Sequence, residues 1–166
     1  EITGDILAFN DSDGQPLVDK ILDCARQKGT GKWASITAMN EGVPLTLIGE
    51  AVFARSLSAM KDERVAAARA YDKKPPVFDG NHGECVEAIR KALLAAKIIS
   101  YAQGFALMRQ AAETYGWELD YGEIALIWRG GCIIRSSFLE RIKEAYDRDL
   151  ALPNLLMDPY FKQCIE

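Results

Sequence analysis

The chain has 166 residues, 49% of them hydrophobic and 27% charged, which is enough to bury a sizeable core as one domain. Its formal net charge is −4 and no stretch concentrates Lys or Arg, so nonspecific binding to nucleic acid or to an anionic membrane is not expected.

The four cysteines are widely spaced and form no Cys-x-x-Cys pair, which is typical of reduced thiols in a cytoplasmic protein. Since His82 is the only histidine, neither a histidine-based metal centre nor a histidine-dependent triad is expected.

The apolar runs of the chain are short. The longest candidate begins at Ala92 and is interrupted by Lys97, Gln103 and Gly104, so it suits a buried core helix better than a membrane span. The first residue is Glu rather than Met, and we expect these residues to be a piece of a longer protein.

Residues 1–26 have the least decided pattern. A loop is expected at 10–16, where acidic turn formers stand beside a glycine and a proline. Read as a calcium loop with Gly14 at its sixth position, this stretch puts Phe9 at the first ligand and Lys20 at the bidentate glutamate. The calcium reading therefore fails, and a polar turn is expected.

Helical patterns dominate the rest of the chain. A loop is expected over 73–83, with His82 near its end, and Asp120 with Glu123 forms a capping-box arrangement. No alternating strand pattern of any length occurs, so the sequence predicts a single all-α domain over 1–166. The expected helical segments are 32–42, 43–72, 84–116, 120–131, 136–149 and 154–166.

The stretch "QKGTGKW", residues 27–33, raises the question of a phosphate-binding loop. It is not a P-loop, because its glycines are two positions apart and its second lysine is followed by Trp33. It still combines backbone freedom, a helix N-terminus near Lys32, the Lys28 ammonium and the Thr30 hydroxyl, which together suit an anion. A glycine-softened helix entry with solvated lysines is the alternative that the residues leave open.

Arg55 is the second candidate for anion binding. An arginine on an apolar helix face must find an anionic partner or extend to solvent. An internal salt bridge and a phosphate or carboxylate ligand both satisfy that requirement. The apolar residues within about 60° of Arg55 on a helical wheel are Ile48, Ala51, Val52 and Ala59.

Six blocks of sequence together resemble one family. They are "QKGTGKW", "GVPLTLIGEAVFAR", "KDERVAAA", "KIISYAQGF", "LDYGEIALIWRGGCIIRSSFL" and "PYFKQ". In this order, over essentially the whole chain, they resemble the helical domain of 6-phosphogluconate dehydrogenase. The resemblance implies a homodimeric enzyme that oxidises 6-phosphogluconate at carbon 3 with NADP and decarboxylates the product to ribulose 5-phosphate. It also implies that the helical domain forms most of the dimer contact.

The resemblance assigns substrate-binding roles to three residues. The K-G-T segment of the family contributes a lysine and a threonine to the substrate phosphate, and these match Lys28 and Thr30. The arginine of the V-F-A-R segment binds the same phosphate and matches Arg55. No catalytic, cofactor-binding or metal-binding residue is expected within these 166 residues.

The resemblance also implies parts that these residues do not include. In the family, the nucleotide-binding domain, the general-base lysine and the general-acid glutamate precede this segment. A tail that carries an arginine and a histidine into the partner subunit follows it, and His82 does not match that histidine. We therefore expect the segment alone to be inactive. The alternatives are a helical assembly module without a substrate role and a related dehydrogenase acting on another phosphorylated hydroxyacid.

Overall fold

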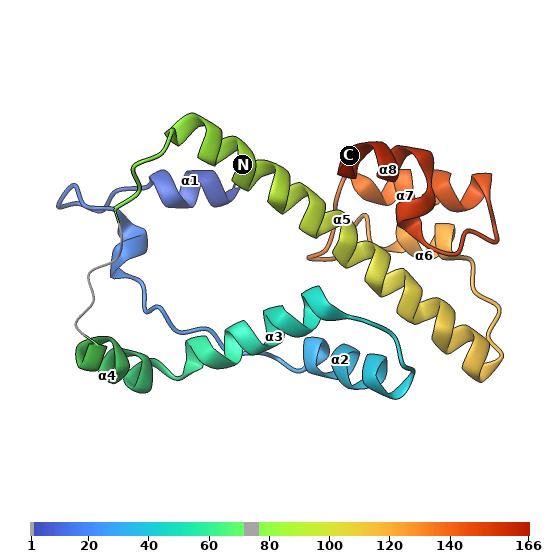
Figure 1. Ribbon diagram of the computed structural model, residues 1–166, viewed down its shortest axis with the longest axis horizontal. Helices are drawn as coiled ribbons and strands as arrows, with labels where there is room; N and C mark the ends of the chain where they lie inside the picture. The colour runs from blue at the N-terminus through green and yellow to red at the C-terminus, as the bar shows by residue number, and fades with distance from the viewer. Residues whose placement is uncertain (1, 72–76) are drawn as a thin grey trace. The chain divides into compact units, whose positions relative to one another are not determined.

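The computed structural model describes residues 2–71 and 77–166 (Figure 1). Within those ranges the regular elements are all helical, apart from one isolated bridge between Asn10 and Pro16, so the all-α prediction is confirmed. The chain forms two compact units. The first comprises residues 1–27 and 53–74, and the second comprises residues 28–52 and 75–166.

The first unit contains residues 2–26, for which the sequence predicts no helix or strand. The loop expected at 10–16 is confirmed as a turn closed by hydrogen bonds such as Asp11 N to Gln15 O, 2.8 Å. Lys20 Nζ lies 2.6 Å from Asp11 Oδ2 and 2.6 Å from Asp13 Oδ2, so one ammonium pairs with both carboxylates of this turn. The helices of this unit are α1 (Ile2–Ala8), the 3-10 helix η1 (Leu17–Lys20), the last part of α3 (Thr46–Ala59) and α4 (Lys61–Tyr71).

The prediction of one helix over 43–72 is wrong, because the helix is interrupted at Met60. Tertiary partners take the carbonyl groups at the end of α3. Arg64 Nη2 donates to Ser58 O at 3.0 Å, and the Cys24 thiol donates to Ala59 O at 3.9 Å. Because good helix formers lie on both sides of Met60, helix propensity does not predict this interruption.

The second unit holds most of the helices. The segment 77–81 is a loop, as predicted, and residues 73–76 of the predicted loop lie outside the described residues. His82 was expected in that loop but is the first residue of a helix, because Asn81 Oδ1 accepts from Gly83 N at 2.9 Å and caps it. The helices are α2 (Thr30–Asn40), the first part of α3, α5 (His82–Tyr115), α6 (Tyr121–Ile127), α7 (Phe138–Arg148), η2 (Leu155–Met157) and α8 (Pro159–Ile165).

The core of the second unit lies around the second half of α5. Figure 1 shows α6, α7 and α8 gathered beside that half, while the first turns of α5 extend away from them. Gly116, with φ of 69°, ends α5, and Asp120 caps α6 by accepting from Glu123 N at 2.9 Å, as the sequence predicts. The largest fully buried side chains of this core are Ile98, Phe105, Leu139, Ile142, Leu155 and Phe161.

Two contacts within the second unit attach the helices that follow the "QKGTGKW" stretch. Gln103 of α5 accepts from Leu47 N at 3.1 Å and donates to Thr46 Oγ1 at 2.8 Å, which anchors the start of α3. A Cβ added at Gly31 would lie only 2.8 Å from Val52 Cγ2, so α2 approaches α3 more closely than any side chain at position 31 would allow. The position of the start of α2 therefore depends on packing against Val52 as well as on the local sequence.

Candidate functional site

Lys28 and Thr30 lie at the N-terminus of α2, which begins at Thr30, two residues before the predicted start. The N-cap is Gly29, whose carbonyl accepts from Trp33 N at 2.9 Å and which has no side chain to cap the helix. The first-turn N–H groups consequently have no side-chain acceptor at this cap, and the helix dipole places a partial positive charge there. Lys28 and Thr30 are both exposed beside it. This end of α2 has the donors and the charge that suit an anion.

The two glycines of the stretch have different roles. Gly29 has φ of 121°, a conformation that residues with a Cβ rarely adopt, so the expectation of unusual backbone dihedrals is confirmed there. Gly31 lies inside α2 and serves helix packing against Val52 instead. Only Gly29 therefore shapes the backbone that leads from Lys28 to Thr30.

Arg55 is exposed on α3, and its Nη2 donates to the main-chain carbonyl of Arg26. Among the residues that the structure describes, no carboxylate forms an ion pair with Arg55, so the internal salt bridge is not observed there. The face around it is not buried either, because α3 has no buried residue. A guanidinium has five N–H donors. Among the described residues only the Arg26 carbonyl accepts from Arg55, which leaves most of these donors for a ligand.

The three predicted residues are divided between the two units. Lys28 and Thr30 belong to the second unit and share the start of one helix, whereas Arg55 belongs to the first unit. Their joint contact with one phosphate stays a prediction.

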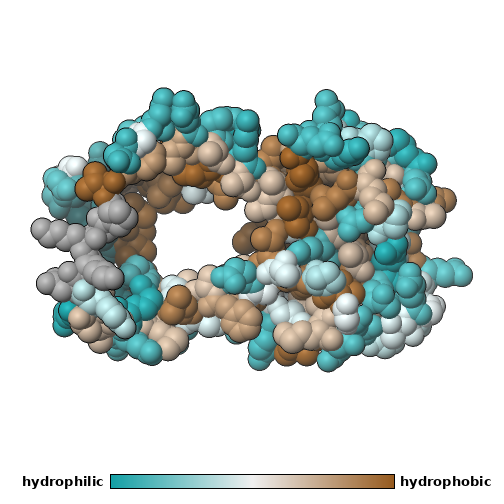
Figure 2. All heavy atoms as spheres, in the orientation of Figure 1, coloured by the Kyte–Doolittle hydropathy of each residue, from teal (hydrophilic) through white to brown (hydrophobic). Residues whose placement is uncertain are grey.

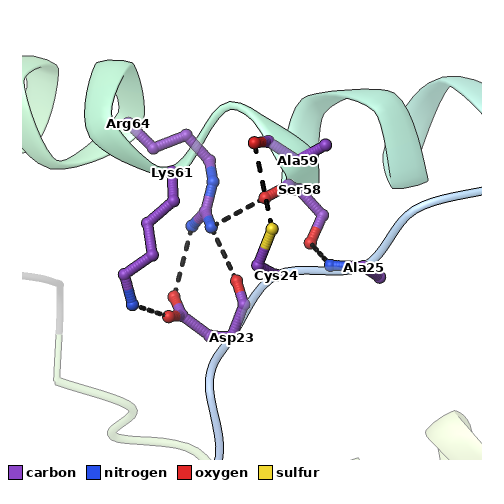
Figure 3. A network of polar contacts seen from close by, with 7 residues as sticks. All are labelled: Asp23, Cys24, Ala25, Ser58, Ala59, Lys61 and Arg64. Atoms are coloured by element: carbon purple, nitrogen blue, oxygen red, sulfur yellow. Dashed lines mark hydrogen bonds and ion pairs between the residues drawn. The ribbon is translucent and has the colours of Figure 1, made fainter.

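The first unit contains a polar network that its local sequence does not predict (Figure 3). We call it the clip and define it as Asp23, Ser58, Lys61 and Arg64. Asp23 accepts from the Lys61 ammonium at one carboxylate oxygen and lies 3.4 Å from Arg64 Nη1 at the other. Its main-chain carbonyl accepts from Arg64 Nη2 at 2.8 Å. The hydrogen bond from Lys61, aided by Arg64, lowers the pKa of the Asp23 carboxyl below its usual range. The only local sequence feature that could have indicated the clip is the Lys-Asp-Glu-Arg run at 61–64. A charged run on a helix ordinarily indicates a solvated face, so this run does not predict the network.

A cavity of about 430 Å³ lies in the second unit, apart from the predicted residues. Its lining is mostly apolar, including Ile48, Tyr101 and Trp128, and Lys97 and Arg135 contribute cations. Neither Lys28 nor Thr30 lines it.

Neither a metal-binding group of side chains nor a membrane-spanning helix occurs among the described residues. Across 2–71 and 77–166, no group of three or more His, Cys, Asp or Glu side chains is placed to hold a metal ion. No helix in the same ranges is long and apolar enough to cross a membrane.

Comparison with known proteins defines the class to which this fold belongs. Residues 1–166 match the family described as 6-phosphogluconate dehydrogenase, C-terminal domain. The chain is 60% identical over 168 residues to the human decarboxylating 6-phosphogluconate dehydrogenase, and the match covers 100% of this chain and 35% of that protein. It is 58% identical over 169 residues to the NADP(+)-dependent, decarboxylating enzyme of Bacillus subtilis, with 100% of this chain and 36% of that protein covered.

A solved structure gives the same assignment. The 6-phosphogluconate dehydrogenase of Plasmodium falciparum, described in its apo form and in complex with its cofactor NADP+ and its substrate 6-phosphogluconate, superposes with a TM-score of 0.91 at 41% identity. The match covers 99% of this chain and 36% of that one. The chain belongs to the 6-phosphogluconate dehydrogenase family, as its C-terminal helical domain, and it spans 35% of the length of its human relative.

Proposed function

We propose that the whole protein is a decarboxylating 6-phosphogluconate dehydrogenase, which converts 6-phosphogluconate to ribulose 5-phosphate with reduction of NADP. The observation that carries this proposal is the family match over every residue of the chain, at 60% identity to the human enzyme. In this proposal the helical domain binds the substrate phosphate and supports a homodimer. NADP and the catalytic groups are held mainly by residues outside these 166. The setting proposed for the enzyme is cytoplasmic.

Three groups of the chain supply the chemistry that a phosphate dianion needs. Lys28 provides an ammonium, Thr30 provides a hydroxyl and a first-turn N–H, and Arg55 provides a planar fork of donors. These groups bind and orient the phosphoryl end of the substrate, so that the hydroxyl at carbon 3 is presented to residues elsewhere in the enzyme. Binding energy from such a remote group supports catalysis by positioning.

The role of Arg55 is tested by Arg55→Ala in the whole enzyme. The KM for 6-phosphogluconate is expected to rise about 10- to 150-fold, the worth of one charge-assisted hydrogen bond, while the KM for NADP stays within about twofold. Arg26→Ala is the matched control, because it removes a neighbouring cation but keeps the carbonyl that Arg55 contacts. An unchanged KM for 6-phosphogluconate in Arg55→Ala would refute the assignment.

The role of Lys28 is tested by Lys28→Met with two substrates. If Lys28 contacts the phosphate, kcat/KM falls for 6-phosphogluconate and stays constant for gluconate, which has no phosphate. Lys32→Met, on the same exposed turn, is the matched control. An equal loss with both substrates would show that Lys28 does not recognise the phosphate. A preference for another phosphorylated hydroxyacid would favour the related-dehydrogenase alternative.

The dimer role is supported by the first half of α5. Val86, Ile89 and Leu93 are 65%, 54% and 66% exposed and recur at helical spacing, so they form one apolar stripe. Figure 2 shows hydrophobic side chains on the visible surface of α5. An apolar stripe of this kind is expected to be covered by a partner. We expect Leu93→Glu to reduce dimerisation in light scattering, whereas Lys91→Glu, on the opposite face, leaves it intact.

A further inference from the structure

The clip fixes main chain as well as side chains. Arg64 Nη2 donates to the carbonyls of both Asp23 and Ser58, at 2.8 and 3.0 Å, so one guanidinium joins the segment before the K-G-T stretch to the end of α3. The Ser58 hydroxyl also accepts from Ala25 N at 3.0 Å (Figure 3). Because a guanidinium is planar and holds its donors in a fixed fork, these bonds define one position of residues 23–25 along the junction of α3 and α4.

The residue that follows this fixed segment is the one that Arg55 contacts. The carbonyl of Arg26 comes directly after Ala25 and accepts from Arg55 Nη2. A free arginine side chain samples many rotamers, and ordering it opposes ligand binding. A carbonyl held in place restricts the Arg55 guanidinium before any ligand arrives.

We infer that Asp23 and Arg64 are positioning residues for phosphate recognition, acting through the Arg26 carbonyl on the guanidinium of Arg55. This inference rests on the phosphate-binding role proposed for Arg55. Stability is a weaker explanation for the ion pairs of Asp23, because its side chain is 62% exposed, whereas the Arg64 side chain is half-buried at 31%. Ion pairs between exposed side chains contribute little to folding. The consequence of breaking the clip therefore falls on substrate binding.

The experiment uses the whole enzyme with Arg64→Ala and Asp23→Asn. Each variant is expected to raise the KM for 6-phosphogluconate about threefold to tenfold, the range of modest coupling energies, with kcat and the KM for NADP within about twofold of the parent. Arg69→Ala removes another cation of α4, in its last turn, and is the matched control. If Arg64→Ala fails to fold, Asp23→Asn decides the question, because it keeps the volume of the side chain while removing its charge and one of its two acceptor oxygens.

The same substitutions in an Arg55→Ala background separate positioning from a purely structural effect. If the clip acts through Arg55, then Arg64→Ala adds less than about a twofold further rise in the KM for 6-phosphogluconate once Arg55 is gone. An equal rise in both backgrounds would overturn the inference. So would a large effect of Arg55→Ala together with unchanged constants in Arg64→Ala and Asp23→Asn. A silent Arg55→Ala would instead refute the proposed role of Arg55 itself.

Discussion

The pair formed by Arg148 and Asp158 offers a sharp test of how the second unit is held together. Asp158 is 2% exposed, and its Oδ2 accepts from Arg148 Nη2 at 2.5 Å and Nε at 3.2 Å. Its Oδ1 caps α8 by accepting from Tyr160 N at 3.0 Å. One buried carboxylate thus joins the end of α7 to the start of α8. Removing it affects both a helix cap and a charge-assisted hydrogen bond.

The two contributions can be estimated separately. Loss of an N-cap costs about 1 kcal/mol, and loss of a charge-assisted hydrogen bond costs about 1.5–3 kcal/mol. Asp158→Ala should therefore lower the free energy of unfolding by about 2.5–4 kcal/mol. Asp158→Asn keeps a good N-cap residue and should cost only about 1–2 kcal/mol, because the charge is lost and the cap remains. The Arg148 side chain is 48% exposed, so solvent screens its charge. Arg148→Ala should therefore lower the free energy of unfolding about as much as Asp158→Asn does.

Urea unfolding followed by far-UV circular dichroism measures these differences, with Glu118→Gln as an exposed control on the loop before α6. The ordering of the variants is the informative result, with Ala more damaging than Asn at position 158. Equal losses for both variants would show that the cap contributes nothing. A loss below about 0.5 kcal/mol in all three variants would refute the reasoning for the pair as a whole.

Three further predictions follow from the packing and charges. Gly31→Ala should destabilise the protein by about 1–3 kcal/mol through the contact with Val52, and Val52→Ala should restore part of that loss in thermal melts. Phe105→Ala should cost about 3–5 kcal/mol in urea unfolding, because this side chain is 1% exposed in the core. The lowered pKa of Asp23 means that the stability it contributes is present above the ordinary aspartate pKa and is lost as pH falls through the lower folded value. Because the Asp23 side chain is 62% exposed, this contribution is small, so Asp23→Asn should flatten the acid limb of a stability–pH profile only slightly, and a large change in that limb would contradict the weak role of the pair in folding.

Some features of the fold could be predicted because the atoms that cause them are close in sequence. Asp120 caps α6 through Glu123 N, three residues away, and Gly116 ends α5 in a left-handed conformation. Both are decided within one helical turn, so residue type and spacing reveal them. The prediction of an anion site at the K-G-T stretch rests on local features in the same way, since Lys28 and Thr30 flank a glycine N-cap.

The features that were missed depend on partners far away in the chain. The interruption at Met60 follows from donors that reach the last carbonyls of α3, among them a thiol from Cys24, 35 residues earlier. The clip likewise joins Asp23 to Lys61 and Arg64, about 40 residues on. The composition of the segment around Asp23 does not indicate that residues 61–64 will lie beside it, and the composition of residues 61–64 does not indicate it either.

The sequence by itself determined the helical class, the ends of α5 to within two residues and the start of α6, because periodicity and capping act within a few residues, whereas the phosphate-binding roles of Lys28, Thr30 and Arg55 stay predictions. Tertiary structure alone decided that Gly31 serves close packing against Val52 and that Arg55 donates to a carbonyl rather than to a carboxylate. Both outcomes depend on which distant atoms come within about 3 Å, because hydrogen bonds and close contacts are made or lost over that distance.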